Sequence, residues 1–202
     1  MNIFYDDNIE QIKRVLYFFY KNDKAFPKSC GKVSMVLTLM FQNSLLSKKY
    51  DIIYNRGYYR NEDEYDDCYC IDIDSNIQDI RKSACIGCDG CGYMVQHSWI
   101  SLVNRTKEPK TYIADFTSIQ FTSYFDKYRD EIFSYNFNKD TLYTYLKSRH
   151  RFIISKRCKD YKNYISLKSI TGEYLFNDTI GKIRKGYPSE FIKYLDMLNY
   201  KI

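Results

Sequence analysis

The chain has 202 residues, a length typical of one domain with a substantial hydrophobic core. Its formal net charge of +6 is modest for this length, so charge does not argue for a nucleic-acid partner, and we expect none. The sequence has neither an apolar run of about 18 residues nor a signal peptide at its start, and it therefore predicts no membrane span and no membrane partner. We expect a soluble, cytoplasmic protein, located in the host cytoplasm or the virion if the chain is viral.

Two helices are predicted in the first fifty residues. Asp6 and Asp7 can cap a first helix that carries apolar residues on one face and ends near Asn22. A second helix is predicted from Val33 to Leu46, where apolar residues occupy nearly every side. A helix of that kind is buried, and we expect it at the centre of the fold.

Cys30 lies just before this buried helix. At a helix N-terminus, the macrodipole and the unpaired backbone N–H groups lower the pKa of a thiol and favour the reactive thiolate. The same N–H groups can stabilise an oxyanion that forms in a reaction. Cys30 is therefore a candidate nucleophile, and a buried, unreactive cysteine is the alternative.

A strand is predicted over residues 50–59, with a turn at Gly57, and a cluster of cysteines follows an acidic loop. Thiolates two residues apart, with glycines that allow tight turns between them, are typical of a tetrahedral zinc site. We expect a structural zinc and no organic cofactor. Disulfides in an oxidising compartment, or thiols without a role, are the alternatives. The candidate ligands are Cys68, Cys70, Cys85, Cys88 and Cys91.

Residues 95–116 predict a β-hairpin whose strands are separated by a polar turn over residues 104–110. His97 comes near the start of the first strand and Asp115 near the end of the second, and such positions lie side by side in an antiparallel pair. A carboxylate beside an imidazole fixes its tautomer and stabilises its charged form, as a general base requires. A buried histidine near an unrelated turn aspartate is the alternative.

The order of these residues resembles the papain-like cysteine enzymes, and among them the transglutaminase-like and arylamine N-acetyltransferase-like branch. Cys30 begins a helix, His97 is followed by Ser-Trp, and Asp115 lies within Ile-Ala-Asp-Phe-Thr-Ser-Ile-Gln-Phe. The resemblance spans roughly residues 26–121 and implies a catalytic triad of Cys30, His97 and Asp115. Papain-type enzymes also place a glutamine shortly before the cysteine, and residues 24–29 contain none. Backbone amides near Gly31, or the side chain of Gln96, are therefore the expected oxyanion donors.

The predicted fold class is α+β, with a papain-like or transglutaminase-like core in which the central helix packs on an antiparallel sheet. Residues 1–121 are the expected catalytic core with a cysteine-rich insertion at 68–91, and residues 122–202 an α/β extension of the same domain. In the extension we predict helices over 124–135 and 140–150, the second capped by Asp140, strands over 151–155, 163–170 and 173–176, and a last helix after Pro188. His150, at a polar helix end, is predicted to be a surface residue.

The resemblance implies a cysteine-nucleophile hydrolase, either a thiol protease or a deamidase. Its substrate would be a protein or peptide, attacked at a peptide bond or at a glutamine side-chain amide. The same triad could serve a transglutaminase or another acyltransferase. A zinc-bearing binding module without activity, in which Cys30 is structural, is the alternative from another class.

Overall fold

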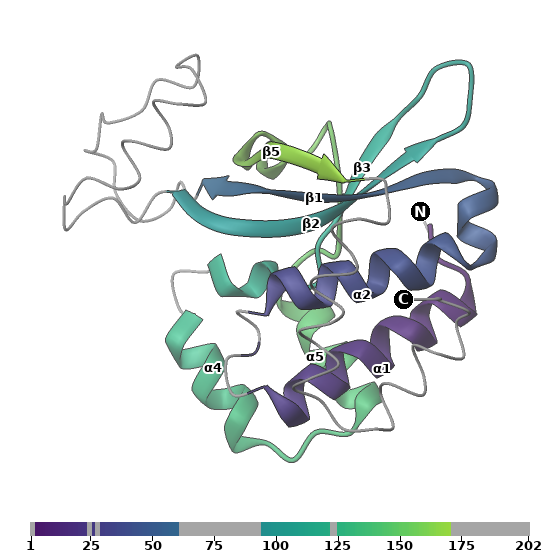
Figure 1. Cartoon of the computed structure of the whole chain (residues 1–202). Coiled ribbons are helices and arrows are strands. Elements are labelled where there is room, and N and C mark those ends of the chain that lie inside the picture. Colours follow the sequence, from purple (N-terminus) through teal and green to yellow (C-terminus); the bar gives the residue numbers. More distant parts are fainter. Residues whose placement is uncertain (1–2, 24–25, 27–28, 61–93, 122–124, 171–202) are drawn as a thin grey trace.

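The computed structural model describes residues 3–23, 26, 29–60, 94–121 and 125–170. They form an α+β architecture in which helices cover one face of a curved antiparallel sheet (Figure 1). This confirms the predicted α+β class. The elements in chain order are α1 (Asp6–Asn22), α2 (Cys30–Gln42), η1 (Leu45–Lys48), β1 (Tyr50–Arg60), β2 (Met94–Asn104), β3 (Thr111–Ala114), η2 (Ser118–Phe121), α4 (Phe125–Ser134), α5 (Lys139–Arg149), β4 (Ile153–Ser155), η3 (Lys159–Asn163) and β5 (Tyr164–Ile170).

Within the described residues the sheet has five strands in the order β4-β3-β2-β1-β5, and every neighbouring pair is antiparallel. β2 and β3 form the predicted hairpin, whose loop is closed by the Asn104 side chain accepting from the Lys110 N–H at 2.6 Å. Both edge strands, β4 and β5, come from the chain after residue 121. The C-terminal part of the described chain therefore completes the same sheet that the N-terminal part begins.

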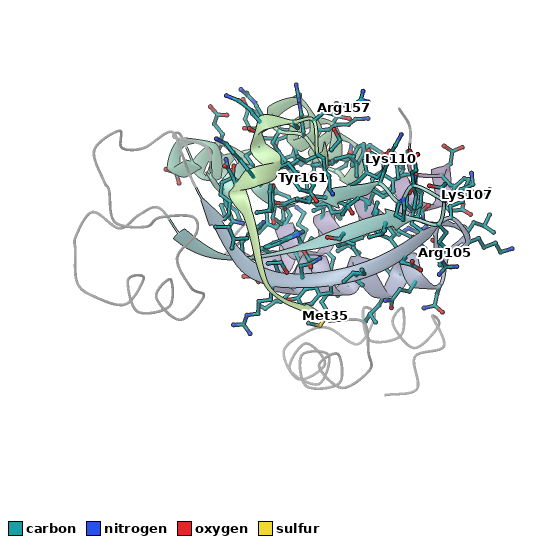
Figure 2. The ribbon with its side chains drawn as sticks, turned by 90° about the horizontal axis from the view of Figure 1, so that it is seen from above. Met35, Arg105, Lys107, Lys110, Arg157 and Tyr161 are labelled. Carbon is teal, nitrogen blue, oxygen red and sulfur yellow. The ribbon has the colours of Figure 1, made fainter. Side chains whose placement is uncertain are left out.

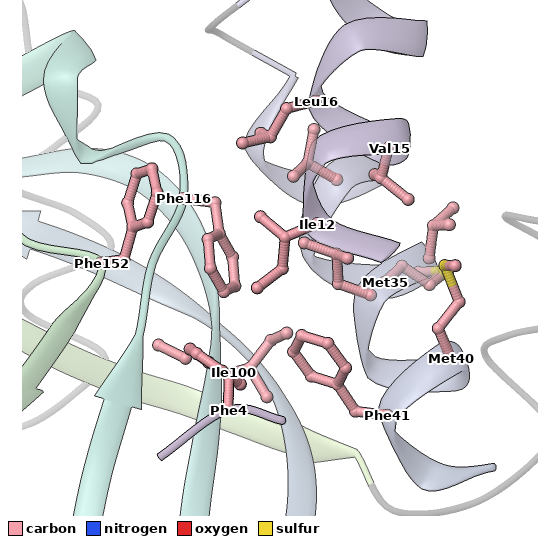
Figure 3. Packing of buried hydrophobic residues seen from close by; sticks show 14 of the residues in the cluster. Phe4, Ile12, Val15, Leu16, Met35, Met40, Phe41, Ile100, Phe116 and Phe152 are labelled. Carbon is pink, nitrogen blue, oxygen red and sulfur yellow. The ribbon is translucent and has the colours of Figure 1, made fainter. Parts of the chain in front are cut away.

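Helix α2 lies at the centre of the fold, with the sheet on one side and α1 on the other (Figure 1). All residues from 33 to 41 are buried, because neither side of this helix faces solvent. Phe41 at its C-terminal end contacts Phe4 (ring centroids 5.3 Å apart), and Phe4 contacts Phe116 beyond β3 (5.9 Å) (Figure 3). Aromatic packing thus connects α2 to the sheet.

The helix ends differ in detail from those predicted. Tyr5, rather than an aspartate, is the N-cap of α1, and Asn8 accepts a hydrogen bond from the Tyr5 N–H at 3.3 Å. Asp6 and Asp7 instead lie in the first turn, where their charges complement the macrodipole. The N-cap of α5 is Asn138, not Asp140, because its side chain reaches the backbone N–H groups of the first turn.

The predicted turn at Gly57 is wrong, since β1 runs straight through this residue. Gly57 instead marks an irregularity in the pairing of β1 with β5. A Cβ atom at Gly57 would lie 2.0 Å from the carbonyl oxygen of Ile165 and 2.9 Å from the Trp99 ring. A glycine inside a strand can mark either a break or a close approach of another backbone, and here it marks the close approach of β5.

The outer face of the sheet, opposite the helices, has a small core of its own. Trp99, Ile113 and Ile154 are buried there, and residues from η3 and β5 pack against them. Figure 2 looks onto this face, and Tyr161 of η3 lies over the strands. In the described part of the chain, no helix combines the length and the apolar character that crossing a bilayer requires.

Replacing Gly57 with alanine should destabilise the fold, because the new methyl group would displace the backbone of β5 rather than a flexible side chain. We expect the free energy of unfolding to fall by about 1–3 kcal/mol or more, measured by urea denaturation. Gly31→Ala is the matched control, since a Cβ there meets only ordinary contacts at 3.8 Å. Equal stabilities of the two variants would contradict the close approach of β5.

Candidate active site

Cys30 is the first residue of α2 and is half-buried. Burial raises the pKa of its thiol. The hydrogen bond to His97, the charge of His97 and a hydrogen bond from the Ser98 backbone lower this pKa, and their combined effect is larger than that of burial. The net result is a pKa below the ordinary value for cysteine. Cys30 is therefore held in surroundings that favour its thiolate, the form that acts as a nucleophile.

His97 is buried on β2, with 1% of its surface exposed. Its Nε2 lies 2.6 Å from Oδ2 of Asp115. Burial lowers the pKa of His97, but the charge and hydrogen bond of Asp115, together with Cys30, raise it to about 9. Because Asp115 occupies Nε2, Nδ1 is the nitrogen left for Cys30. At neutral pH these opposite shifts favour a thiolate–imidazolium pair over two neutral groups.

Asp115 follows β3 directly and has no exposed surface. Its Oδ2 accepts from the Tyr164 hydroxyl at 2.9 Å as well as facing His97, and its Oδ1 accepts from the backbone N–H and the hydroxyl of Thr117 at 2.9 and 3.1 Å. Burial raises the pKa of this carboxyl, but the His97 charge and these hydrogen bonds outweigh it and leave the pKa lowered. Asp115 is therefore ionised and fixed in position.

The other side of the imidazole faces Gln120, on η2. The amide nitrogen of Gln120 lies 3.2 Å from Nδ1 of His97. Aromatic side chains enclose the ring: Trp99 stacks on it with centroids 6.0 Å apart, and Tyr59 and Tyr164 lie 6.2 and 6.0 Å away. These contacts leave the ring little freedom to turn away from Asp115.

Helix α2 is joined to β2 through the backbone of Ser98. The last β2–β3 pair is Ile100 with Ala114, so Ser98 lies beyond the end of β3. Its carbonyl accepts from the Ser34 hydroxyl at 2.9 Å, and its backbone also hydrogen-bonds Cys30. The Ser98 hydroxyl in turn accepts from Tyr54 at 2.9 Å. The end of β3 thus leaves a place on β2 for the N-terminal turn of α2.

The structure brings the predicted residues Cys30, His97 and Asp115 together into one hydrogen-bonded chain. Gly31 lies beside Cys30 in the first turn of α2, where backbone N–H groups lack partners within the helix. Gln96 belongs to β2 and pairs with Tyr58, but its side chain lies outside the described part of the structure. The catalytic and oxyanion roles of these residues remain predictions.

The predicted zinc ligands Cys68, Cys70, Cys85, Cys88 and Cys91 lie outside the described residues, so the zinc site also remains a prediction. Among the residues that are described, no group of three or more His, Cys, Asp or Glu side chains could hold a metal ion. The segment that carries the five cysteines leaves β1 at Arg60 and enters β2 at Met94, and these two residues pair. The chain therefore returns from this segment to the sheet at Met94, three residues before His97.

Among the residues that contact the triad, Gln120 and Tyr164 were not predicted from the sequence. Gln120 had a weak signal, since it follows Asp115 by five positions in a single turn. Tyr164 had none, because it reaches Asp115 only through the pairing of β5 with β1. A tyrosine in a strand is ordinary, and nothing local to it points toward a carboxylate 49 positions earlier.

The prediction that His150 lies on the surface is wrong in part. The residue is half-buried, but both ring nitrogens are buried and lack a well-formed hydrogen bond to described residues. Its ring packs on Phe152, with centroids 4.9 Å apart. Burial lowers the pKa of His150 to about 4, against the opposing effects of the Asp115 charge and the Phe116 backbone. His150 is therefore a neutral, packed side chain at neutral pH.

The lowered pKa of Cys30 predicts fast alkylation by iodoacetamide between pH 6 and 7. Mass spectrometry should find that Cys30 reacts faster than Cys158. Cys158 is a half-buried thiol that donates a hydrogen bond to Asp160 and accepts one from Arg151. His97→Gln removes the imidazolium, and we expect the rate at Cys30 to fall about tenfold for each unit by which the pKa rises. An unchanged rate in His97→Gln would show that His97 does not activate Cys30.

The two histidines predict opposite effects of pH on the free energy of unfolding. His97 has a folded pKa of about 9, above the ordinary 6.5, so its contribution is complete below pH 6.5 and is lost as the pH rises toward 9. His150 has a folded pKa of about 4, so stability is lost as the pH falls from 6.5 toward 4. Urea denaturation across this range should show His150→Leu flattening only the acid side. An acid side identical to that of the wild type would contradict a buried, neutral His150.

Comparisons with known proteins return no match, whether with family models, with curated proteins or with solved structures. The function of this site is therefore argued from its geometry and chemistry. A buried carboxylate holds an imidazole, the imidazole holds a thiol, and the thiol begins a central helix. A thiol, an imidazole and a carboxylate in this order can serve as nucleophile, base and orienting group in covalent catalysis.

Proposed function

We propose that this protein is a cysteine-nucleophile hydrolase that cleaves amide bonds in a protein or peptide, either in the backbone or in a glutamine side chain. The observation that carries the proposal is the continuous chain of hydrogen bonds from Cys30 through His97 to Asp115, with the pKa of the thiol lowered and that of the imidazole raised. Perturbed titratable groups cluster at functional sites because catalysis needs them. We propose a papain-like fold of the transglutaminase-like branch, supported by the α+β architecture and by α2 packing on the sheet.

In the proposed reaction the Cys30 thiolate attacks the carbonyl carbon, which forms a C–S bond and moves the π electrons onto oxygen. The tetrahedral intermediate collapses, the C–N bond breaks, and the proton on His97 passes to the leaving amine or ammonia. Water then attacks the thioester while His97 takes one of its protons. The C–S bond breaks, and the products are a carboxylic acid and the regenerated Cys30–His97 pair. Asp115 stays ionised throughout and stabilises the imidazolium.

A peptide library separates hydrolysis from acyl transfer. The protein is incubated with peptides of varied sequence in ¹⁸O-labelled water containing putrescine as an amine, and the products are identified by mass spectrometry. A protease leaves shortened peptides with ¹⁸O in the new carboxyl group, a deamidase converts glutamine to labelled glutamate, and a transglutaminase attaches putrescine. If the protein forms no product and Cys30 is alkylated no faster than Cys158, the proposal is overturned in favour of a binding module.

Once such an activity is found, Cys30→Ala should abolish it and leave the melting temperature within a few degrees of the wild type. Asp115→Asn should lower kcat on the order of 10³–10⁴-fold, because the orienting residue acts through the tautomer and charge of the base. Cys158→Ala, at a thiol bonded to Asp160 rather than to the triad, should keep full activity. Full activity in Cys30→Ala would show that another group is the nucleophile.

A further inference from the structure

Gln120 is fixed by the same short turn that fixes Asp115. Its backbone N–H donates to the Thr117 carbonyl at 3.1 Å, and Thr117 itself holds Oδ1 of Asp115. The neighbouring Ile119 is fully buried and anchors η2 in the core. This turn therefore presents a carboxylate to one nitrogen of His97 and an amide to the other.

The contact between Gln120 and His97 depends on the protonation of the imidazole. An amide nitrogen only donates hydrogen bonds, so at 3.2 Å it is favourable when Nδ1 carries a lone pair. That state is the neutral tautomer with its proton on Nε2, directed at Asp115. Once Nδ1 is protonated, two N–H groups face each other, and the amide nitrogen of Gln120 loses its acceptor.

We propose that Gln120 is a catalytic residue that donates to the oxyanion of the tetrahedral intermediate, because its amide nitrogen has no acceptor at Nδ1 while His97 is protonated. This inference rests on the proposed function. Nδ1 is also the nitrogen left for Cys30, so the Gln120 amide lies next to the position where the attacked carbonyl must sit. The N–H groups of the first turn of α2 supply further donors. Gln120 thus fills the role for which the sequence suggested Gln96.

Two reagents that modify Cys30 by different chemistry test the proposal. With iodoacetamide, the Cys30 thiolate attacks the methylene carbon, the C–S bond forms as the C–I bond breaks, and iodide leaves, so no oxyanion forms. p-Nitrophenyl acetate forms a C–S bond through a tetrahedral oxyanion and expels p-nitrophenolate, a leaving group that needs no proton. Both rates are measured at Cys30 by peptide mass spectrometry. Their ratio reports oxyanion stabilisation separately from thiolate formation.

In Gln120→Met, which keeps the length of the side chain but cannot donate, we expect acylation of Cys30 to fall on the order of 10²-fold while alkylation does not fall. Gln120→Glu, closer still in shape and also without a donor at neutral pH, should show the same selective loss of acylation. Gln42→Met is the matched control, because the Gln42 amide donates to the Ile52 carbonyl at 3.0 Å and should leave both rates unchanged.

The failures of the two proposals are distinguishable. If acylation and alkylation fall together in both Gln120 variants, Gln120 acts only by positioning His97, and its oxyanion role is overturned. If neither rate changes, Gln120 has no role in the chemistry. If wild-type Cys30 reacts no faster than Cys158 with either reagent, the nucleophile itself is wrong, and the proposed function falls together with this inference.

Discussion

The ionised carboxylate of Asp115, which has no contact with solvent, is the constraint on which the rest of the structure depends. An unpaired buried charge costs several kcal/mol or more, so this group is tolerable only with its oxygens fully bonded. The partners come from His97 on β2, Thr117 in the turn after β3 and Tyr164 on β5. The carboxylate is therefore satisfied only when strands from both halves of the chain have paired, which makes the C-terminal part of the sheet a component of the site.

The different lengths of β2 and β3 decide where the thiol can approach. β3 ends at Ala114, whereas β2 extends six residues beyond the last paired position, Ile100, to Met94. In that extension Ser98 has no partner on β3, and its backbone binds Ser34 and Cys30 of α2 instead. The same extension carries His97. One strand end thus holds α2 through the backbone of Ser98 and also carries His97, so the Cys30 thiol and the imidazole meet beyond the end of β3.

The parts of this site that follow from local pattern were predictable from the sequence. The predicted hairpin placed His97 and Asp115 side by side, and the apolar run after Cys30 indicated a buried helix. Tyr164 was not predictable, because its position depends on how β5 pairs with β1 around Gly57. Gly57 was misread because a strand glycine signals either a turn or a close backbone contact, and only the neighbour decides. His150 was misread because a histidine at a polar helix end gives no sign of the Phe152 ring that covers it.

The arrangement has a consequence for how the charges of the site are balanced. Tyr164 donates to the same oxygen of Asp115 that faces His97, so the carboxylate shares its charge between two donors. Burial opposes the charge on the imidazolium, whereas Asp115 and Cys30 favour it, and together they raise the pKa of His97 to about 9. A general acid with such a pKa can still release its proton. Folding has already desolvated and oriented these groups, so the reorganisation that water would have to undergo around them is complete before a substrate arrives.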